Sequence, residues 1–232
     1  MKSNQFFNDF SSLTKFSLAI WLLFLAQGCM STPIGYEDNI TEAKQETIHR
    51  ETPVPAISSD DEYISNTETA HVKLPPGILL KWLFHCPLEK LLLGTEDIAP
   101  VIRTDNLTNS WGTPGSRRRV VLGDGNTALE ELLVYEEDKG FKYIVWNFTN
   151  EARMVTNYAI GEFVITDKDG GSDITWAYKF QKKSCLTGMI LSDFVKNDYK
   201  GYMQVCMKAI KELAIKENIQ TNCLETGQLN MF

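Results

Sequence analysis

Apolar and polar residues alternate in several short segments between residues 116 and 180, and turn residues separate each segment from the next. Alternation with a period of two predicts strands that each have one buried face. The turns at 123–126 (Gly-Asp-Gly-Asn) and 167–171 (Asp-Lys-Asp-Gly-Gly) are typical of hairpins. Because hairpins join antiparallel neighbours, we predict an antiparallel sheet. Its five strands are expected at 116–122, 128–135, 141–148, 158–166 and 174–180.

A different period marks the C-terminal part of the chain. Between residues 195 and 213 apolar residues recur at steps of three and four, which predicts one face of an amphipathic helix. Shorter segments predict a strand at 72–74 and two short helices at 77–84 and 87–90. A long amphipathic helix after a curved antiparallel sheet lays its apolar stripe on the concave face. The fold class is therefore α+β, with room for a pocket between sheet and helix. The stripe consists of Val195, Tyr199, Tyr202, Cys206, Ala209, Ile210 and Leu213.

The net charge of -7 is concentrated in one short segment. Residues 30–70 hold nine acidic residues against two basic ones, which gives -7 for this segment alone. The predicted folded part from residue 71 onward is close to neutral. A neutral domain has no broad basic field that would attract phosphates, so we expect no nucleic-acid partner.

The first 28 residues are typical of an export signal. A polar start precedes an apolar run at 16–26, which is too short to span a bilayer. The run ends in Leu-Ala-Gln-Gly-Cys at 25–29, which resembles the lipobox of bacterial lipoproteins, with Cys29 as the acylated residue. Met30 after this cysteine resembles the outer-membrane sorting case. We therefore expect a lipid anchor in the cell envelope, in the outer membrane and facing the periplasm. An ordinary signal peptide cleaved near Gly28 is the alternative.

Residues 29–70 are predicted to form a disordered acidic tether. Charged and polar residues dominate, three prolines interrupt the segment, and no apolar period is sustained. Such a composition does not bury enough surface to offset the conformational entropy lost on folding. The predicted organisation is therefore a signal peptide at 1–28, a tether at 29–70 and one folded domain at 71–232.

Several segments of this domain resemble a known superfamily. They occur in the right order between residues 72 and 216: PGSRRRVVLGDG at 114–125, EELLVY at 130–135, FKY at 141–143, GEF at 161–163, DITWAYKF at 173–180 and GYM at 201–203. Together they are similar to the SRPBCC superfamily, which includes START-like lipid carriers and polyketide cyclase-like proteins. The resemblance implies a helix-grip fold, in which about seven antiparallel strands wrap around the last helix and two short helices close one end. It also implies a cavity for a small hydrophobic ligand.

One choice of strand register places five residues as candidates for lining that cavity. In this register Arg119 and Glu131 form a pair inside the pocket, where they would orient a polar ligand group or move a proton. Tyr143, Trp176 and Tyr178 would supply aromatic walls. The alternative is that Arg119 and Glu131 form a structural pair on the outer face, because a one-residue error in register reverses every assignment.

No catalytic motif is present in the sequence. It has no Gly-x-Ser-x-Gly elbow, no glycine-rich phosphate loop and no His-Glu-x-x-His zinc helix. We therefore predict no metal and no cofactor, and we expect a structural role for the adjacent His85 and Cys86. In an oxidising compartment the four cysteines of the domain permit two disulfides in three pairings, with a buried free thiol at Cys206 as the alternative. These cysteines are Cys86, Cys185, Cys206 and Cys223.

Three functions remain open at this point. The first is a non-enzymatic carrier of a lipid-like or other hydrophobic molecule at the membrane. The second is a cyclase or hydratase that uses Glu131, Arg119 or Tyr143 as acid or base. The third is an envelope interaction protein whose cavity is filled by its own side chains. The superfamily includes all three kinds, so the fold does not choose between them.

Overall fold

The computed structural model describes residues 49–57, 62–108 and 110–225 of the chain, with side chains up to residue 217. The chain divides into two compact units, Met1–Glu42 and Ala43–Phe232. Every described residue belongs to the second unit. The predicted signal peptide, Cys29 and the tether up to residue 48 lie outside the described residues. Among the residues described, no helix has both the length and the apolar character needed to cross a membrane.

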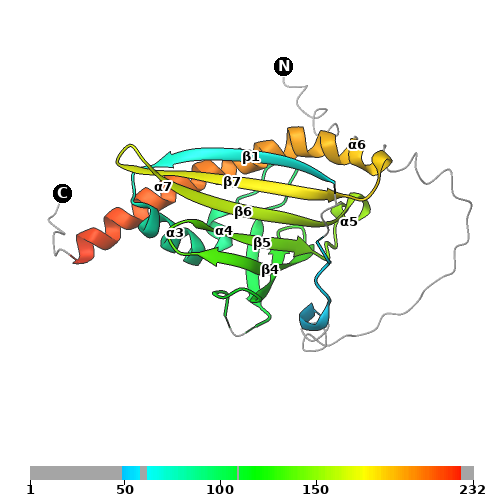
Figure 1. Cartoon of the computed structure of the whole chain (residues 1–232), viewed down its shortest axis with the longest axis horizontal. Helices are drawn as coiled ribbons and strands as arrows, with labels where there is room; N and C mark the ends of the chain where they lie inside the picture. The colour runs from blue at the N-terminus through cyan, green and yellow to red at the C-terminus, as the bar shows by residue number, and fades with distance from the viewer. Residues whose placement is uncertain (1–48, 58–61, 109, 226–232) are drawn as a thin grey trace, which may run out of the picture. The chain divides into compact units, whose positions relative to one another are not determined.

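Seven antiparallel strands form a single curved sheet, shown in Figure 1. Their order across the sheet is β1-β7-β6-β5-β4-β3-β2, so β1 and β2 are the two edge strands. The five predicted hairpin strands are confirmed as β3 to β7, with bounds within a few residues of the expected ones. The strands are β1 (Tyr63–Val72), β2 (Val101–Asn106), β3 (Arg117–Leu122), β4 (Thr127–Glu136), β5 (Gly140–Trp146), β6 (Thr156–Lys168) and β7 (Gly171–Lys182).

Helices cover one face of this sheet. The two predicted short helices are confirmed as α3 (Pro76–His85) and α4 (Leu88–Leu91), and the long C-terminal helix is α7 (Lys200–Glu225). Helix α3 begins with Pro76. Proline is tolerated in the first helical turn because an N–H there would have no carbonyl partner within the helix. Figure 1 shows α7 running across the sheet. Helix α6 (Cys185–Phe194) and the π-helical turn η1 (Val195–Tyr199) lead directly into α7, so the helical region begins before the predicted start at 195. A further short helix, α5 (Ala152–Val155), lies between β5 and β6.

Strand β1 begins inside the predicted tether. It was expected at 72–74 but spans Tyr63–Val72 and pairs along its whole length with β7. Its inward positions include Asn66 and Glu68, whose partners Met203 and Gln204 lie on α7. These polar inward positions remove the alternation that marks a strand in a sequence. The sheet therefore starts eight residues before the expected domain boundary at 71.

The main core lies between the concave face of the sheet and the helices. Inward residues of β5, β6 and β7 meet the apolar stripe of α7, which includes Tyr202, Met203, Cys206 and Ile210. Their burial follows from the alternation of strand side chains between the two faces. Area buried in this way is the principal source of folding free energy.

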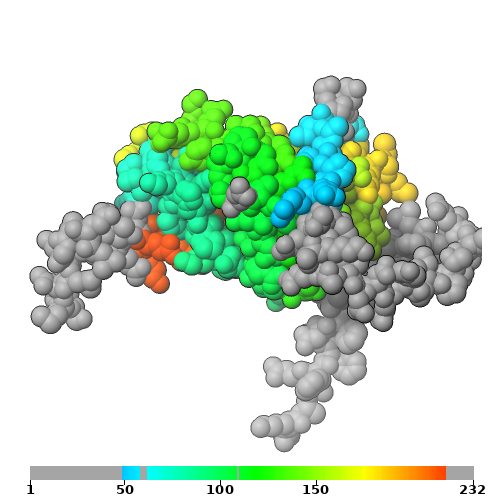
Figure 2. Space-filling view, turned by 90° about the horizontal axis from the view of Figure 1, so that it is seen from below, coloured from blue at the N-terminus to red at the C-terminus, as the bar shows by residue number. Residues whose placement is uncertain are grey.

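A second, smaller apolar cluster covers the convex face. It consists of Leu107, Leu129, Ile144, Trp146 and Tyr158. Val54, from the segment 49–57, packs against this cluster. Figure 2 shows the segment in blue, against the surface of the green strands.

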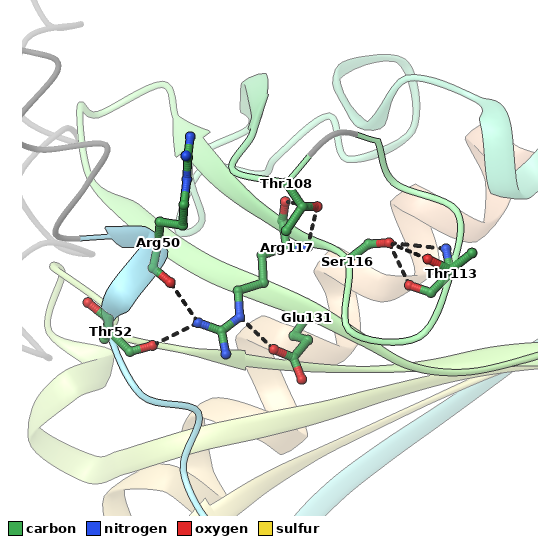
Figure 3. A network of polar contacts seen from close by, with 7 residues as sticks. All are labelled: Arg50, Thr52, Thr108, Thr113, Ser116, Arg117 and Glu131. Atoms are coloured by element: carbon green, nitrogen blue, oxygen red, sulfur yellow. Dashed lines mark hydrogen bonds and ion pairs between the residues drawn. The ribbon is translucent and has the colours of Figure 1, made fainter.

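Arg117 holds the segment 49–57 to the sheet, as Figure 3 shows. Its Nη1 donates to the carbonyl oxygens of Arg50 and Thr52, at 2.9 and 3.1 Å. Its Nε donates to Glu131 at 2.6 Å, which fixes the direction of the guanidinium group. The same guanidinium lies 5.7 Å from the ring centre of Trp146. The convex face is therefore covered by a segment that was expected to belong to the disordered tether.

Arg117→Met should release this segment. Because two hydrogen bonds to backbone carbonyls are lost, amide hydrogen exchange across residues 50–57 is expected to accelerate about tenfold. Exchange measured by mass spectrometry on the corresponding peptide checks this. Lys142→Met serves as the control, since it removes an ion pair of β5 with Glu162 without touching the segment. Equal exchange in both variants would contradict the assigned role of Arg117.

Candidate functional site

A cavity lies between the concave face of the sheet and helices α3, α4 and α7. Its volume is about 30 Å³, room for roughly two water molecules. The walls come from eight elements and three connecting segments, so residues far apart in the sequence meet there. Most of the lining is apolar or aromatic: Leu83, Phe84, Cys86, Leu88, Leu91, Leu92, Trp111, Phe141, Phe163, Trp176 and Ile210.

Two oppositely charged side chains face this apolar cavity. Arg118 of β3 and Glu130 of β4 are direct neighbours across the two strands. Arg118 Nε donates to Glu130 Oε2 at 2.7 Å, and the two side chains are only 11% and 8% exposed. The guanidinium carbon also lies 3.9 Å from the ring centre of Trp111, within the range of a cation–π contact. The buried charges are thus paired, as burial requires.

Tyr143 of β5 brings a third polar group to the cavity. Its hydroxyl accepts a hydrogen bond from the Trp176 indole at 3.2 Å. Burial, and then the neighbouring Tyr178 and Glu130, raise the pKa of Tyr143 well above its ordinary value. The hydroxyl therefore keeps its proton at neutral pH and remains a hydrogen-bond donor as well as an acceptor.

Gly161 of β6 makes the position of Tyr143 possible. It lies directly across from Tyr143 on β5 and from Tyr178 on β7. A Cβ at residue 161 would stand 2.1 Å from Tyr143 Cζ and 2.4 Å from its hydroxyl oxygen. The absent side chain lets the Tyr143 ring lie over β6 and reach Trp176 on the next strand. Trp176 in turn stacks on Phe163, with ring centres 5.2 Å apart.

The predicted pair of Arg119 and Glu131 is wrong. Arg119 instead donates to Asp105 of β2 at 2.7 and 3.0 Å, and Glu131 pairs with Arg117. Both lie on the convex side, with the cluster around Trp146, as the alternative assignment had it, but they pair with Asp105 and Arg117 and not with each other. The physical reason is a bulge in β4.

The bulge lies between Leu132 and Val134. An extra residue there reverses which faces the following side chains take. Tyr135 lies beyond the bulge and packs on the concave side. In a regular strand every second residue faces the same side, so counting back from Tyr135 would place Glu131 on the concave side. The bulge instead places Glu130 inside, and the arginine opposite Glu130 is Arg118.

The three aromatic candidates all lie on the concave side. Tyr143 and Trp176 line the cavity. Tyr178 is buried next to them, with its ring centre 6.4 Å from that of Tyr143, but it belongs to a packed aromatic cluster with Phe180 and Tyr199. Sequence reasoning missed Arg118, Glu130, Phe84 and Trp111. The opposite register of the strands would have placed Arg118 and Glu130 in the cavity. No local sequence pattern marks Phe84 or Trp111 as cavity residues.

The cysteines of the described region are free thiols, so the permitted disulfides are not formed among Cys86, Cys185 and Cys206. Cys86 lines the cavity, and burial raises the pKa of its thiol to about 11. It is therefore protonated at neutral pH and a poor nucleophile. Its neighbour His85 is exposed. Within the described ranges, no three His, Cys, Asp or Glu side chains gather as metal ligands.

No protein-family model matches the chain, and no curated protein matches it in sequence. Solved structures do match. One is Ara h 8.0201, with a TM-score of 0.52 and 21% identity over 67% of this chain and 99% of that one. A norcoclaurine synthase point mutant from Thalictrum, in complex with a transition-state analogue, has a TM-score of 0.52 and 12% identity over 69% and 99%.

A third match is the major latex-like protein 151 of Panax ginseng, with a TM-score of 0.51 and 13% identity over 66% of this chain and 97% of that one. Each alignment includes nearly the whole of the matched protein and about two thirds of this chain. At these identities the likeness concerns the fold. The domain therefore has the Bet v1-like helix-grip fold, which is the fold that the sequence resemblance implied.

Proposed function

We propose that the protein binds a small hydrophobic molecule in the cavity between sheet and helices, and that it does so as a lipid-anchored protein of the bacterial envelope. The lining of the cavity supports this proposal. Its aromatic and aliphatic walls surround a few polar groups, which Arg118, Glu130 and Tyr143 contribute. Ligand pockets typically combine apolar walls with a small number of placed polar groups that fix orientation.

The cavity must open to admit such a ligand. Its volume of about 30 Å³ is below the several hundred Å³ of typical ligand pockets. Two parts of the wall are suited to move outward. Helix α4 is one turn long, and Trp111 is a half-buried residue of the connection between β2 and β3. Displacing them adds space without breaking hydrogen bonds between the strands.

The small volume also favours a second candidate function. In that case the core is filled by its own side chains and the domain is an envelope interaction module without ligand. The convergence of Glu130 and Tyr143 would suit proton transfer as well, which is a third possibility. A binding experiment that recovers the probe and compares its mass and chromatographic retention with those of the original probe separates all three functions.

The test uses 2-naphthol and the purified full-length chain, with binding measured by calorimetry. Saturable binding with unchanged probe mass is expected. Leu88→Trp, at the half-buried rim of the cavity, should weaken binding at least about tenfold by filling it. Leu93→Trp is the matched control, because Leu93 lies nearby but is 50% exposed. Absence of binding would favour the filled-core module, and a changed probe mass would favour an enzyme.

The anchor is tested separately. Cys29→Ser removes the thiol that would accept the lipid, so the protein should move from the membrane fraction to the soluble fraction of its bacterial host. A diacylglyceryl group holds a protein through the burial of its acyl chains, at about 0.8 kcal/mol per CH₂. Fractionation followed by mass spectrometry of the N-terminal peptide measures both location and acylation. A variant that stays in the membrane as an uncleaved precursor would refute lipid anchoring.

A further inference from the structure

The two charges facing the cavity cancel each other. Arg118 and Glu130 are joined at 2.7 Å and both are nearly buried. Trp111 lies over the guanidinium group, so the pair is shielded from water on that side. The net charge of the cavity lining is therefore zero, because the other lining residues are neutral.

A charged ligand therefore meets an unfavourable site. A carboxylate would have to replace Glu130 as the partner of Arg118 and leave Glu130 buried next to a second negative charge. An ammonium group would displace Arg118 in the same way. Interactions between charges are strong where water is excluded, and an unpaired buried charge is costly. The pair thus selects against both signs.

A neutral hydroxyl group suits the same atoms. The ion pair uses Arg118 Nε and Glu130 Oε2, which leaves the terminal guanidinium nitrogens as donors and Glu130 Oε1 as an acceptor towards a ligand. The Tyr143 hydroxyl on the neighbouring strand can donate as well. A ligand hydroxyl both donates and accepts, so it can join this group without disturbing the pair.

We infer that the Arg118–Glu130 pair is a selectivity element, which makes the cavity accept neutral hydroxyl-bearing aromatic or polycyclic molecules and reject carboxylates and ammonium compounds. This inference rests on the proposed binding function and specifies its ligand class. The aromatic walls formed by Phe84, Phe141, Phe163 and Trp176 favour flat rings over a flexible acyl chain.

Three probes with the same ring system test the inference on the full-length chain: 2-naphthol, naphthalene and 2-naphthoate, titrated by calorimetry at pH 7. The wild type should bind 2-naphthol about tenfold more tightly than naphthalene. A tenfold ratio in affinity corresponds to the free energy of about one hydrogen bond to a charged group. It should bind 2-naphthoate at least about tenfold more weakly than 2-naphthol. Glu130→Gln frees the charge of Arg118 and should reverse the order, so that 2-naphthoate binds best.

Glu131→Gln is the matched control, since this neighbour lies on the convex side and pairs with Arg117. It should keep the wild-type order. If Glu130→Gln does not fold, the double variant Arg118→Met with Glu130→Met replaces it, and the preference for 2-naphthol over naphthalene should vanish. Equal binding of the three probes to the wild type would overturn the selectivity while leaving the binding function in place. Binding of none of them would overturn the binding function itself.

Discussion

Arg118→Met should lower the free energy of unfolding by about 3–5 kcal/mol, because it leaves the Glu130 carboxylate buried without its partner. Two ion pairs join an arginine of β3 to a glutamate of β4. The Arg118–Glu130 pair is the more deeply buried of the two, because its side chains are only 11% and 8% exposed. Urea denaturation of the variant and the wild type measures the difference.

Two further variants make this result interpretable. Replacing both residues by Met should recover most of the loss, since an apolar pair of similar size leaves no unpaired charge. Lys142→Met breaks the pair with Glu162, whose side chains are 37% and 30% exposed, and should cost no more than about 1 kcal/mol. If Arg118→Met costs as little as Lys142→Met, the Arg118–Glu130 pair is not effectively buried.

Gly161→Ala should destabilise the domain by about 1–3 kcal/mol, the range for overpacked cores. The added methyl group would stand 2.1 Å from Tyr143 Cζ, so the Tyr143 ring must move and its hydrogen bond with Trp176 is lost. Thermal unfolding followed by circular dichroism measures the loss of stability. The near-ultraviolet signal of Trp176 and Tyr143 should change together with it.

Gly201→Ala is the control for Gly161→Ala, and the opposite sign is expected. Nothing lies within 4 Å of a Cβ at residue 201 in α7, and Ala is favoured over Gly in a helix by about 1 kcal/mol. In the background of Tyr143→Leu, the cost of Gly161→Ala should shrink, because the atoms that clash are gone. An unchanged cost in that background would show that the strain lies elsewhere.

The hairpin strands were predictable because the information is local. Strands β3 to β7 combine alternation with turns such as 123–126, and the stripe of α7 has a helical period, so their types follow from short windows. The edge strand β1 was predicted only as a short strand at 72–74. The other edge strand β2 and the helix α6 were not predicted. For β1 the reason is visible in Asn66 and Glu68, which face α7 and carry no apolar signal.

The site was predictable only in part. Tyr143 and Trp176 were assigned to the concave side because β5 and β7 alternate regularly up to the cavity. Arg118 and Glu130 were missed because a single extra residue in β4, between Leu132 and Val134, changes the face that each residue takes. A bulge has no fixed sequence signature, so alternation alone cannot place it.

The sequence by itself determined the fold class, the order of the hairpins, the long C-terminal helix and the aromatic character of the concave face. These depend on periodicities that each segment carries alone. Only the tertiary structure decided that Arg118 and Glu130 face the cavity, that Arg117 and Glu131 hold segment 49–57 on the outside, and that Gly161 makes room for Tyr143. The physical reason is that these facts depend on pairing between strands, where a shift of one residue exchanges the two faces of the sheet.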